Sequence, residues 1–132
     1  MDALRKPGDT DPRVLIVDDE AGICKLMETL LAQAGFHCET ASSGQEALEI
    51  LRQQEFDALI SDLRMPGMSG LALLEAARAQ YPKMVLILAT GGGDVGAGIE
   101  AKKQCAHDYI VKPFRLDTVV MTLKRALENK PT

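Results

Sequence analysis

The segment RVLIVDDEAGICKLMETLLAQAG, residues 13–35, joins two different hydrophobic patterns in one short stretch. Its first part, Arg13–Asp18, is a continuous apolar run that ends in acid, which is typical of a β-strand buried on both faces. Residues 20–34 then place apolar side chains three and four positions apart, and Gly35 follows where helices often end. The segment therefore predicts a buried strand followed by a helix with one apolar face.

The same alternation continues along the chain. Further strands are predicted at residues 36–41, 56–61, 84–89 and 109–111, and further helices through residues 47–51, 71–77 and 115–128. Ser43, with Glu46 three residues later, predicts a capping box at the start of the second helix. Because each right-handed crossover between parallel strands needs a helix to return the chain, the pattern predicts an α/β fold. We expect a single open five-stranded parallel sheet, with strand order 2-1-3-4-5 and helices on both faces.

The composition excludes several classes of protein. The chain has 132 residues, 46% of them hydrophobic, which suits one domain: a leader at 1–12, the domain at 13–128 and a tail at 129–132. A formal net charge of −4 disfavours direct nucleic-acid binding. No apolar stretch reaches the roughly 18 residues of a membrane span, and the chain start has no apolar signal core. The three cysteines have no paired spacing, so we expect reduced thiols and a cytoplasmic location.

Polar, reactive side chains stand at the carboxyl ends of four predicted strands, and they are Asp18 with Asp19, Asp62, Thr90 and Lys112. In an open parallel sheet these ends meet at one edge, where ligands bind at the reversal of strand order. Carboxylates gathered there repel each other by roughly 3 kcal/mol per pair at about 5 Å, so a cation is expected. Oxygen ligands favour Mg²⁺. The ammonium and hydroxyl groups suit a tetrahedral anion, so one carboxylate is expected to accept a phosphoryl group.

Four motifs carry a family resemblance: VDDE at 17–20, SDLRMPGMSG at 61–70, LATGGGDV at 88–95 and DYIVKPF at 108–114. Their order and spacing resemble those of response-regulator receiver domains of two-component systems, the CheY-like superfamily. The match runs from about residue 13 to residue 128. The resemblance implies a cytoplasmic phosphorylation switch.

The resemblance also assigns roles at the metal and acceptor positions. The phosphoacceptor falls on Asp62, and the acidic metal pair falls on Asp18 and Asp19. The backbone carbonyl of Arg64 would complete the protein's share of the Mg²⁺ ligands, with Mn²⁺ as a substitute.

The remaining roles concern the phosphoryl group and the response to it. Thr90 matches the hydroxyl residue that bonds the phosphoryl group, Lys112 the lysine that pairs with it, and Tyr109 the aromatic residue that turns inward. A cis bond is expected between Lys112 and Pro113. The implied donor is a sensor histidine kinase or a phosphotransfer protein. A downstream protein or output domain would bind the face of helix four, strand five and helix five, and a phosphorylation-dependent dimer is compatible with this. The expected chemistry is self-directed phosphotransfer and autodephosphorylation, not enzymatic turnover of a substrate.

Other interpretations of these residues exist. A pseudo-receiver would use the fold as a protein-interaction module without phosphorylation. A phosphatase with an aspartate nucleophile needs a second carboxylate two places after it, where this chain has Arg64. Asp18 or Asp19 could also cap the first helix, a role that is compatible with metal binding.

The glycines at 91, 93 and 96 match the pattern G-x-G-x-x-G of dinucleotide-binding sites. The context disagrees, because the motif follows the fourth strand and the next strand ends in Lys112, where that fingerprint has an acid. Dinucleotide binding is therefore not expected.

The region of the fourth helix, residues 91–106, departs from the family pattern. Receivers usually have a Gly–Ala pair near its end, where this chain has Cys105 and Ala106. Cys105 would be strained by about 1 kcal/mol if the same left-handed backbone were kept.

Gly96 and Gly98 weaken the same helix by up to about 1 kcal/mol each relative to alanine. We therefore expect a short, shifted or mobile helix, with Lys102 pointing outward rather than joining the apolar stripe of Val95 and Ile99. No output domain follows the last predicted helix, so a stand-alone receiver is expected, with a fragment of a longer regulator as the alternative.

Overall fold

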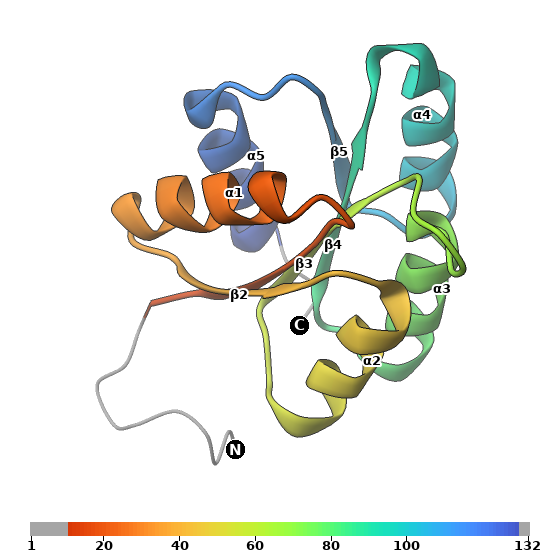
Figure 1. The fold of residues 1–132 in the computed structure, drawn as a ribbon, viewed down its shortest axis with the longest axis horizontal. Helices are drawn as coiled ribbons and strands as arrows, with labels where there is room; N and C mark the ends of the chain where they lie inside the picture. Colours follow the sequence, from red (N-terminus) through yellow and green to blue (C-terminus); the bar gives the residue numbers. More distant parts are fainter. Residues whose placement is uncertain (1–10, 130–132) are drawn as a thin grey trace.

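The chain folds around a five-stranded parallel sheet with strand order β2-β1-β3-β4-β5 (Figure 1). The computed structural model describes residues 11–129, so residues 1–10 of the expected leader and 130–132 of the expected tail lie outside the described residues. The strands are β1 (Arg13–Val17), β2 (His37–Ala41), β3 (Ala58–Asp62), β4 (Val85–Thr90) and β5 (Asp108–Val111). The helices are α1 (Ala21–Gln33), α2 (Gly44–Gln53), α3 (Gly70–Gln80), the 3-10 turn η1 (Gly92–Asp94), α4 (Val95–Gln104) and α5 (Leu116–Glu128). The predicted architecture and strand order are confirmed.

Helices cover both faces of the sheet, with α1 and α5 on one face and α2, α3 and α4 on the other (Figure 1). Alternate residues of β1 enter two separate cores: Val14 and Ile16 belong to the core under α1 and α5, and Leu15 and Val17 to the core under α2 and α3. This double cover explains why β1 is a continuous apolar run rather than an alternating one. Among residues 11–129, no helix combines the length and the apolar character needed to cross a membrane.

All five strands and the first and last helices begin and end within two residues of the predicted bounds. The predicted ranges of α2 and α3 are too short, by three residues at the start of α2 and at the end of α3, and α4 begins four residues inside its predicted region. β3 and β4 each extend one residue beyond the prediction, so Asp62 and Thr90 are the last residues of their strands. Gly35 follows α1 with a φ of +95°, a left-handed conformation that favours glycine at a helix end. The bond between Lys112 and Pro113 is cis, as predicted.

The start of α2 confirms one half of the expected capping box. The Ser43 side chain accepts a hydrogen bond from the Glu46 N–H at 3.1 Å. The Glu46 carboxylate, however, accepts from the N–H of Ser42 at 2.6 Å and from its hydroxyl at 3.0 Å. The reciprocal bond is therefore displaced by one residue, and the cap still satisfies two backbone donors near the helix start.

Glycine is required at position 70, where α3 begins against the end of β3. A Cβ atom built on Gly70 would lie 2.0 Å from the backbone carbonyl oxygen of Asp62. The Gly70 N–H donates to the Leu63 carbonyl at 2.9 Å, and the Ser69 side chain caps α3 by accepting from Ala72 N–H at 3.1 Å. These contacts hold the backbone that carries the Asp62 side chain.

The fourth helix is more regular than the sequence suggested. α4 has ten residues, as many as α2, and η1 leads directly into it. Cys105 follows it with a φ of −148°, and no residue other than glycine in the described range 11–129 has a positive φ. The strain expected at Cys105 therefore does not arise, while mobility of α4 stays a prediction.

The expected apolar stripe of α4 is wrong. The buried residues of the helix are Gly98 and Ala101, whereas Val95 is half-buried and Ile99 is 46% exposed. Small residues face the sheet because they allow the helix backbone to lie close to it. Lys102 is exposed, as expected.

The three cysteines are free thiols, as predicted. The buried Cys24 thiol donates to the Asp18 carbonyl at 3.3 Å, and burial is the main cause that raises its pKa. Burial raises the pKa of Cys38 to about 11. A raised pKa disfavours the reactive thiolate, so these cysteines serve packing.

His107 ties the start of β5 to the neighbouring strand through a hydrogen bond that requires a neutral ring. The ring Nδ1 accepts from the Leu86 N–H at 3.0 Å, and the backbone N–H of His107 donates to the Leu86 carbonyl at 2.7 Å. Burial, followed by the charge of Arg78, lowers the pKa of His107 below its ordinary value of 6.5. The folded state therefore favours the neutral imidazole.

We expect the free energy of unfolding to fall below pH 6.5 for this reason. The unfolded chain binds the proton more readily, so the contribution of His107 is complete above its ordinary pKa and is lost as the pH falls toward the lower pKa of the folded state. Urea titrations between about pH 8 and pH 5 would measure the slope. His107→Asn keeps an acceptor near the Leu86 N–H but does not titrate, so its slope should be shallower; equal slopes would contradict the assignment.

Candidate functional site

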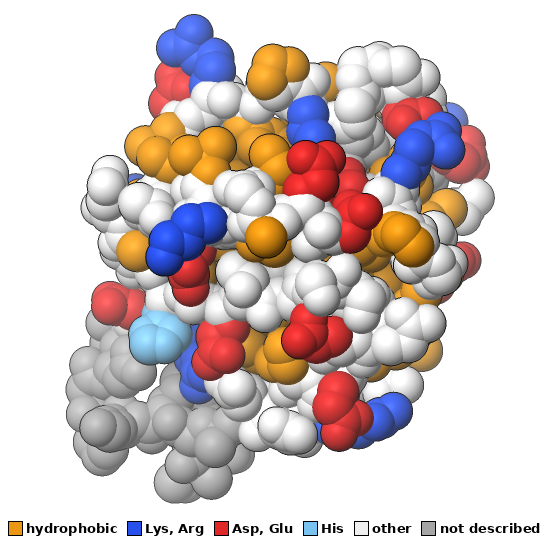
Figure 2. Space-filling model, in the orientation of Figure 1, with side chains coloured by type: hydrophobic (Ala, Val, Ile, Leu, Met, Phe, Trp, Pro, Cys, Tyr) orange, Lys and Arg blue, Asp and Glu red, His pale blue; other side chains and the backbone are white. Residues whose placement is uncertain are grey.

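Four charged side chains meet at the carboxyl ends of the strands, near the reversal of strand order, and Thr90 ends the strand beside them. Asp18 and Asp19 directly follow β1, Asp62 ends β3, Thr90 ends β4 and Lys112 directly follows β5. Figure 2 shows acidic side chains at several places on the face in view, some of them close together just above its centre. The fold therefore assembles the set that the sequence singled out.

The three carboxylates lie close enough to share one ion. One oxygen from each of Asp18, Asp19 and Asp62 lies within 4.8 Å of the others. The side chains of Asp18 and Asp62 are only 3% and 12% exposed, whereas Asp19 is exposed. Two of the three charges are thus held away from bulk water.

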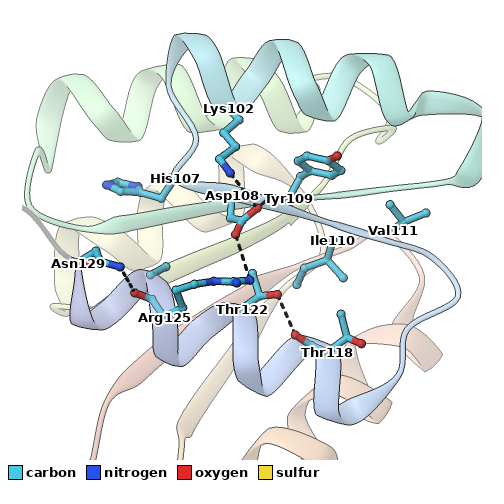
Figure 3. Close-up of a pocket in the computed structure, with 11 residues that line it drawn as sticks. Lys102, His107, Asp108, Tyr109, Ile110, Val111, Thr118, Thr122, Arg125 and Asn129 are labelled. Carbon is cyan, nitrogen blue, oxygen red and sulfur yellow. Dashed lines mark hydrogen bonds and ion pairs between the residues drawn. The ribbon is translucent and has the colours of Figure 1, made fainter.

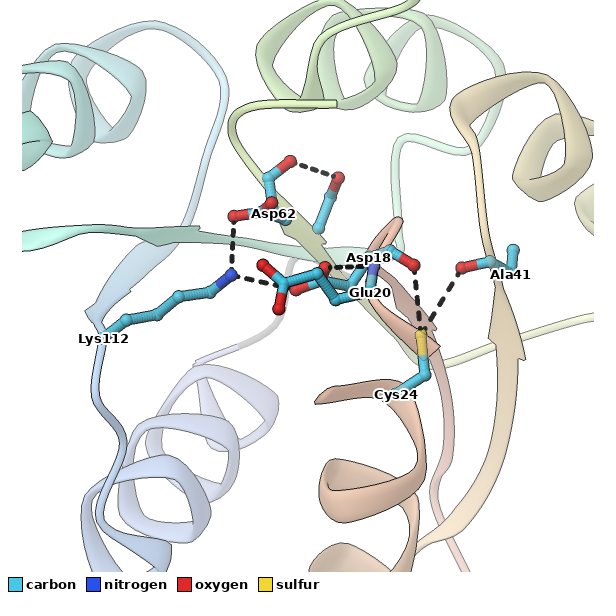
Figure 4. A network of polar contacts seen from close by, with 7 residues as sticks. Asp18, Glu20, Cys24, Ala41, Asp62 and Lys112 are labelled. Carbon is cyan, nitrogen blue, oxygen red and sulfur yellow. Dashed lines mark hydrogen bonds and ion pairs between the residues drawn. The ribbon is translucent and has the colours of Figure 1, made fainter. Parts of the chain in front are cut away.

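Lys112 neutralises part of this charge by reaching between two carboxylates (Figure 4). Its Nζ lies 2.9 Å from Asp18 Oδ2 and 2.9 Å from Asp62 Oδ1, and its side chain is 22% exposed. The backbone N–H of Lys112 donates to the Thr90 carbonyl at 2.7 Å, which fixes the start of the lysine side chain beside β4.

The pKa values of Asp62 and Lys112 are shifted by burial and by the charged groups beside them. Burial raises the pKa of Asp62, and the charges of Asp18 and Asp19 add to this effect against the opposing hydrogen bond from Lys112. For Lys112, burial acts to lower the pKa, but the two bonded carboxylates outweigh it, so the net pKa is raised. The site thus holds a charged lysine among acids that retain excess negative charge.

Thr90 presents a hydroxyl group without a hydrogen-bond partner. The residue is fully buried, and its Oγ1 is one of two buried side-chain polar atoms in the described part of the chain that have no partner. A buried polar group left unpaired costs about 1–3 kcal/mol, so such groups call for an explanation. A ligand oxygen at the strand ends would satisfy this hydroxyl.

Neither Asp18 nor Asp19 is the N-cap residue of α1. The N-cap of α1 is Glu20, which makes no side-chain capping bond. Asp18 Oδ1 instead accepts from the Glu20 N–H at 2.9 Å, which fixes the carboxylate beside the end of β1 while its other oxygen faces Lys112 (Figure 4).

The Arg64 side chain makes a contact that no pattern in the sequence predicts. Its guanidinium forms two hydrogen bonds to Asp94 in η1, at 2.8 and 2.6 Å. The pair joins the loop after β3 to the loop after β4, and it lowers the pKa of Asp94. No local pattern links residues 30 positions apart, so sequence alone gave no signal. The role of the Arg64 carbonyl as a metal ligand stays a prediction.

Comparison with known proteins identifies the family of the chain. Residues 14–124 match the model of the response regulator receiver domain. The chain belongs to the response-regulator receiver family. This receiver is 41% identical over 116 residues to the DNA-binding transcriptional regulator NtrC of Escherichia coli K12, covering 88% of this chain and 25% of NtrC.

Solved structures share the fold of this receiver. A response regulator receiver domain protein from Clostridium thermocellum has a TM-score of 0.85 and 32% identity, covering 89% of this chain and 95% of that one. The receiver domain of NtrX from Brucella abortus has a TM-score of 0.84 and 31% identity, covering 87% and 98%. This receiver spans about a quarter (25%) of the length of NtrC.

Proposed function

We propose that this receiver acts in the cytoplasm as a phosphorylation switch with Asp62 as the acceptor. The single observation that carries the proposal is the placement of the Asp62 carboxylate beside the Lys112 ammonium, at the end of a strand whose paired neighbour ends at Thr90 with its unpaired hydroxyl. Phosphoryl transfer asks a protein mainly to position the reactants and to neutralise the oxygens of the transferred group. Lys112 supplies a positive charge for this, and Thr90 supplies a free donor.

The transfer itself is a displacement at phosphorus. An oxygen of Asp62 forms a bond to the phosphorus atom while the P–N bond of a phosphohistidine breaks, and the electron pair leaves with the imidazole. The donor is a sensor histidine kinase or a phosphotransfer protein. Water later attacks the acyl phosphate and restores the carboxylate, so the chemistry remains directed at the receiver itself.

A divalent cation fits the acidic cluster. The donor set consists of carboxylate oxygens from Asp18, Asp19 and Asp62 within 4.8 Å of one another, which suits Mg²⁺, with Mn²⁺ as a substitute. The Arg64 backbone carbonyl is our fourth proposed protein ligand. When bound, the ion supplies charge neutralisation for the phosphoryl oxygens.

The response is proposed to pass through Thr90 and Tyr109 to the α4-β5-α5 face. A Thr90 hydroxyl drawn toward the phosphoryl group would leave room that the Tyr109 side chain fills. Apolar side chains on this face are exposed, among them Ile99, Val111 and Leu116. A downstream protein, an output domain or a second phosphorylated copy would bind there. NtrC is a DNA-binding transcriptional regulator, which supports an output in transcription for a longer protein of this kind.

We expect a phosphoryl adduct when this receiver is incubated with acetyl phosphate and Mg²⁺. Intact-mass spectrometry would measure the mass gain of one phosphoryl group, and cleavage by hydroxylamine would identify an acyl phosphate. Replacing Mg²⁺ with a chelator should prevent the reaction, because the carboxylates would then repel the anionic donor.

The same experiment separates the rival functions. A protein-interaction module without phosphorylation would give no adduct. A phosphatase would hydrolyse acetyl phosphate continuously, without accumulation of an adduct. Arg64 stands where such a phosphatase needs a second carboxylate, and its side chain is held by Asp94, so we expect the adduct and no sustained turnover.

A further inference from the structure

Gly98 is the point where the backbone of α4 meets the Tyr109 ring. A Cβ atom built on Gly98 would lie 2.8 Å from Cδ2 and 2.9 Å from Cγ of Tyr109, and 3.3 Å from its Cβ. Cβ atoms essentially never approach other atoms more closely than 3.0 Å. Figure 3 shows the Tyr109 ring on the α4 side of β5, opposite the side chains of α5. Even the smallest side chain at position 98 would displace this ring or lift the helix.

The other glycine within α4 provides an internal comparison. Gly96 is exposed, and a Cβ atom there would meet nothing within 4 Å. Glycine weakens a helix at both positions because it has more conformational freedom to lose. Only at position 98 does the structure supply a steric reason to keep it.

The position of Tyr109 connects this contact to the phosphorylation site. Tyr109 pairs with Leu88 in the register of β4 and β5, and Thr90, with its unpaired hydroxyl, lies two residues further along β4. The half-buried ring packs against the core on the face covered by α3 and α4. Thr90 therefore lies at a diagonal position from Tyr109 on the neighbouring strand, and Gly98 meets the Tyr109 ring from α4.

We propose that Gly98 is a positioning residue of the switch: its missing side chain seats the Tyr109 ring against α4, so the size of residue 98 sets where the ring lies and how far it can respond to phosphorylation. Only the second part of this proposal, the response of the Tyr109 ring to phosphorylation, rests on the proposed function. The seating of the ring concerns the phosphate-free protein and can be tested by itself.

The test compares Gly98→Ala with Gly96→Ala. The chain has two tyrosines and no tryptophan, so in a Tyr81→Phe background the tyrosine fluorescence comes from Tyr109 alone. We expect Gly98→Ala to increase acrylamide quenching of this fluorescence by roughly twofold, because overpacking forces the ring outward. Gly96→Ala should match the parent.

The response is then measured with beryllofluoride and Mg²⁺ as a phosphoryl analogue. The parent and Gly96→Ala should show a change in Tyr109 fluorescence, and Gly98→Ala a change of less than half that size, while phosphoryl uptake from acetyl phosphate is the same in all three. A parent that takes up neither compound would refute the proposed function but not the seating of the ring. Equal quenching and equal responses in the two alanine variants would overturn this inference.

A double-mutant cycle keeps the inference testable if Gly98→Ala folds poorly. Removing the ring by Tyr109→Ala removes the obstacle, so Gly98→Ala should then raise the melting temperature by roughly 2–5 °C, as expected for glycine to alanine in a helix. In the presence of the ring, the same change should lower it. A decrease of equal size in both backgrounds would show that the ring is not the obstacle.

Discussion

Asp62→Asn is expected to abolish phosphoryl uptake from acetyl phosphate while leaving the fold intact. Asparagine has nearly the shape of aspartate, but its amide does not act as a nucleophile toward phosphorus. The two oxygens of Asp62 are the reacting atoms of the proposal, so the loss should be complete within the detection limit of intact-mass spectrometry. A persistent adduct in the variant would place the acceptor elsewhere.

The same substitution is expected to stabilise the metal-free protein. Carboxylates about 5 Å apart repel each other by roughly 3 kcal/mol at an effective dielectric of about 20. Burial and the neighbouring acids raise the pKa of Asp62, so its ionised form is unfavourable in the folded state. The lost attraction to Lys112 offsets part of the gain, and we expect a net increase in unfolding free energy on the order of 1 kcal/mol.

Urea unfolding with a chelator and with Mg²⁺ would measure this effect. The gain in unfolding free energy of Asp62→Asn over the wild type should shrink or reverse in Mg²⁺, because the ion stabilises the three carboxylates of the wild type more than the two of the variant. Asp117→Asn serves as the matched control, since Asp117 is exposed and pairs only locally with Arg115. It should take up phosphate normally and show no dependence on Mg²⁺. A less stable metal-free Asp62→Asn would show that Lys112 outweighs the repulsion.

Much of the fold and the site could be predicted because both depend on local patterns. Apolar runs ending in Asp18, Asp62 and Thr90 identify the strands, and helices between them dictate a parallel sheet. The carboxyl ends of such strands meet at one edge whatever the helices do in detail. The grouping of these residues with Lys112 therefore follows from strand order alone.

What the sequence could not give are contacts between loops and the choice of buried helix face. The pairing of Arg64 with Asp94 joins two loops, and no periodicity links them. For α4, apolar Val95 and Ile99 suggested the inward face, but Gly98 and Ala101 occupy it. At Gly98 the Tyr109 ring leaves no room for a larger residue. Hydrophobicity alone does not encode how closely a helix approaches its sheet.

The sequence also did not predict that Lys112 lies between Asp18 and Asp62 in the metal-free protein. A further prediction follows from this contact. Lys112→Met is expected to destabilise the metal-free protein by about 3 kcal/mol, because removing one partner of a buried ion pair leaves uncompensated charge. Asp18 and Asp62 are only 3% and 12% exposed and would lose a cation 2.9 Å away from each. Methionine retains the length of the side chain, so the loss reports mainly on charge.

Mg²⁺ should reverse most of this loss, since a cation bound to the same carboxylates replaces the ammonium. The variant should also bind Mg²⁺ about tenfold more tightly, because a unit charge about 5 Å from a divalent ion repels it by roughly 1.7 kcal/mol even in water. Calorimetric titration would measure the affinity, and urea unfolding with and without Mg²⁺ would measure the rescue.

Lys102→Met is the control, because Lys102 is exposed and its Nζ lies 3.8 Å from Asp108, away from the cluster. If Mg²⁺ failed to restore Lys112→Met, or stabilised both lysine variants equally, the lysine and the ion would not share the same carboxylates. The carboxylates that Lys112 neutralises in the metal-free protein and the proposed metal site would then be separate features of the molecule.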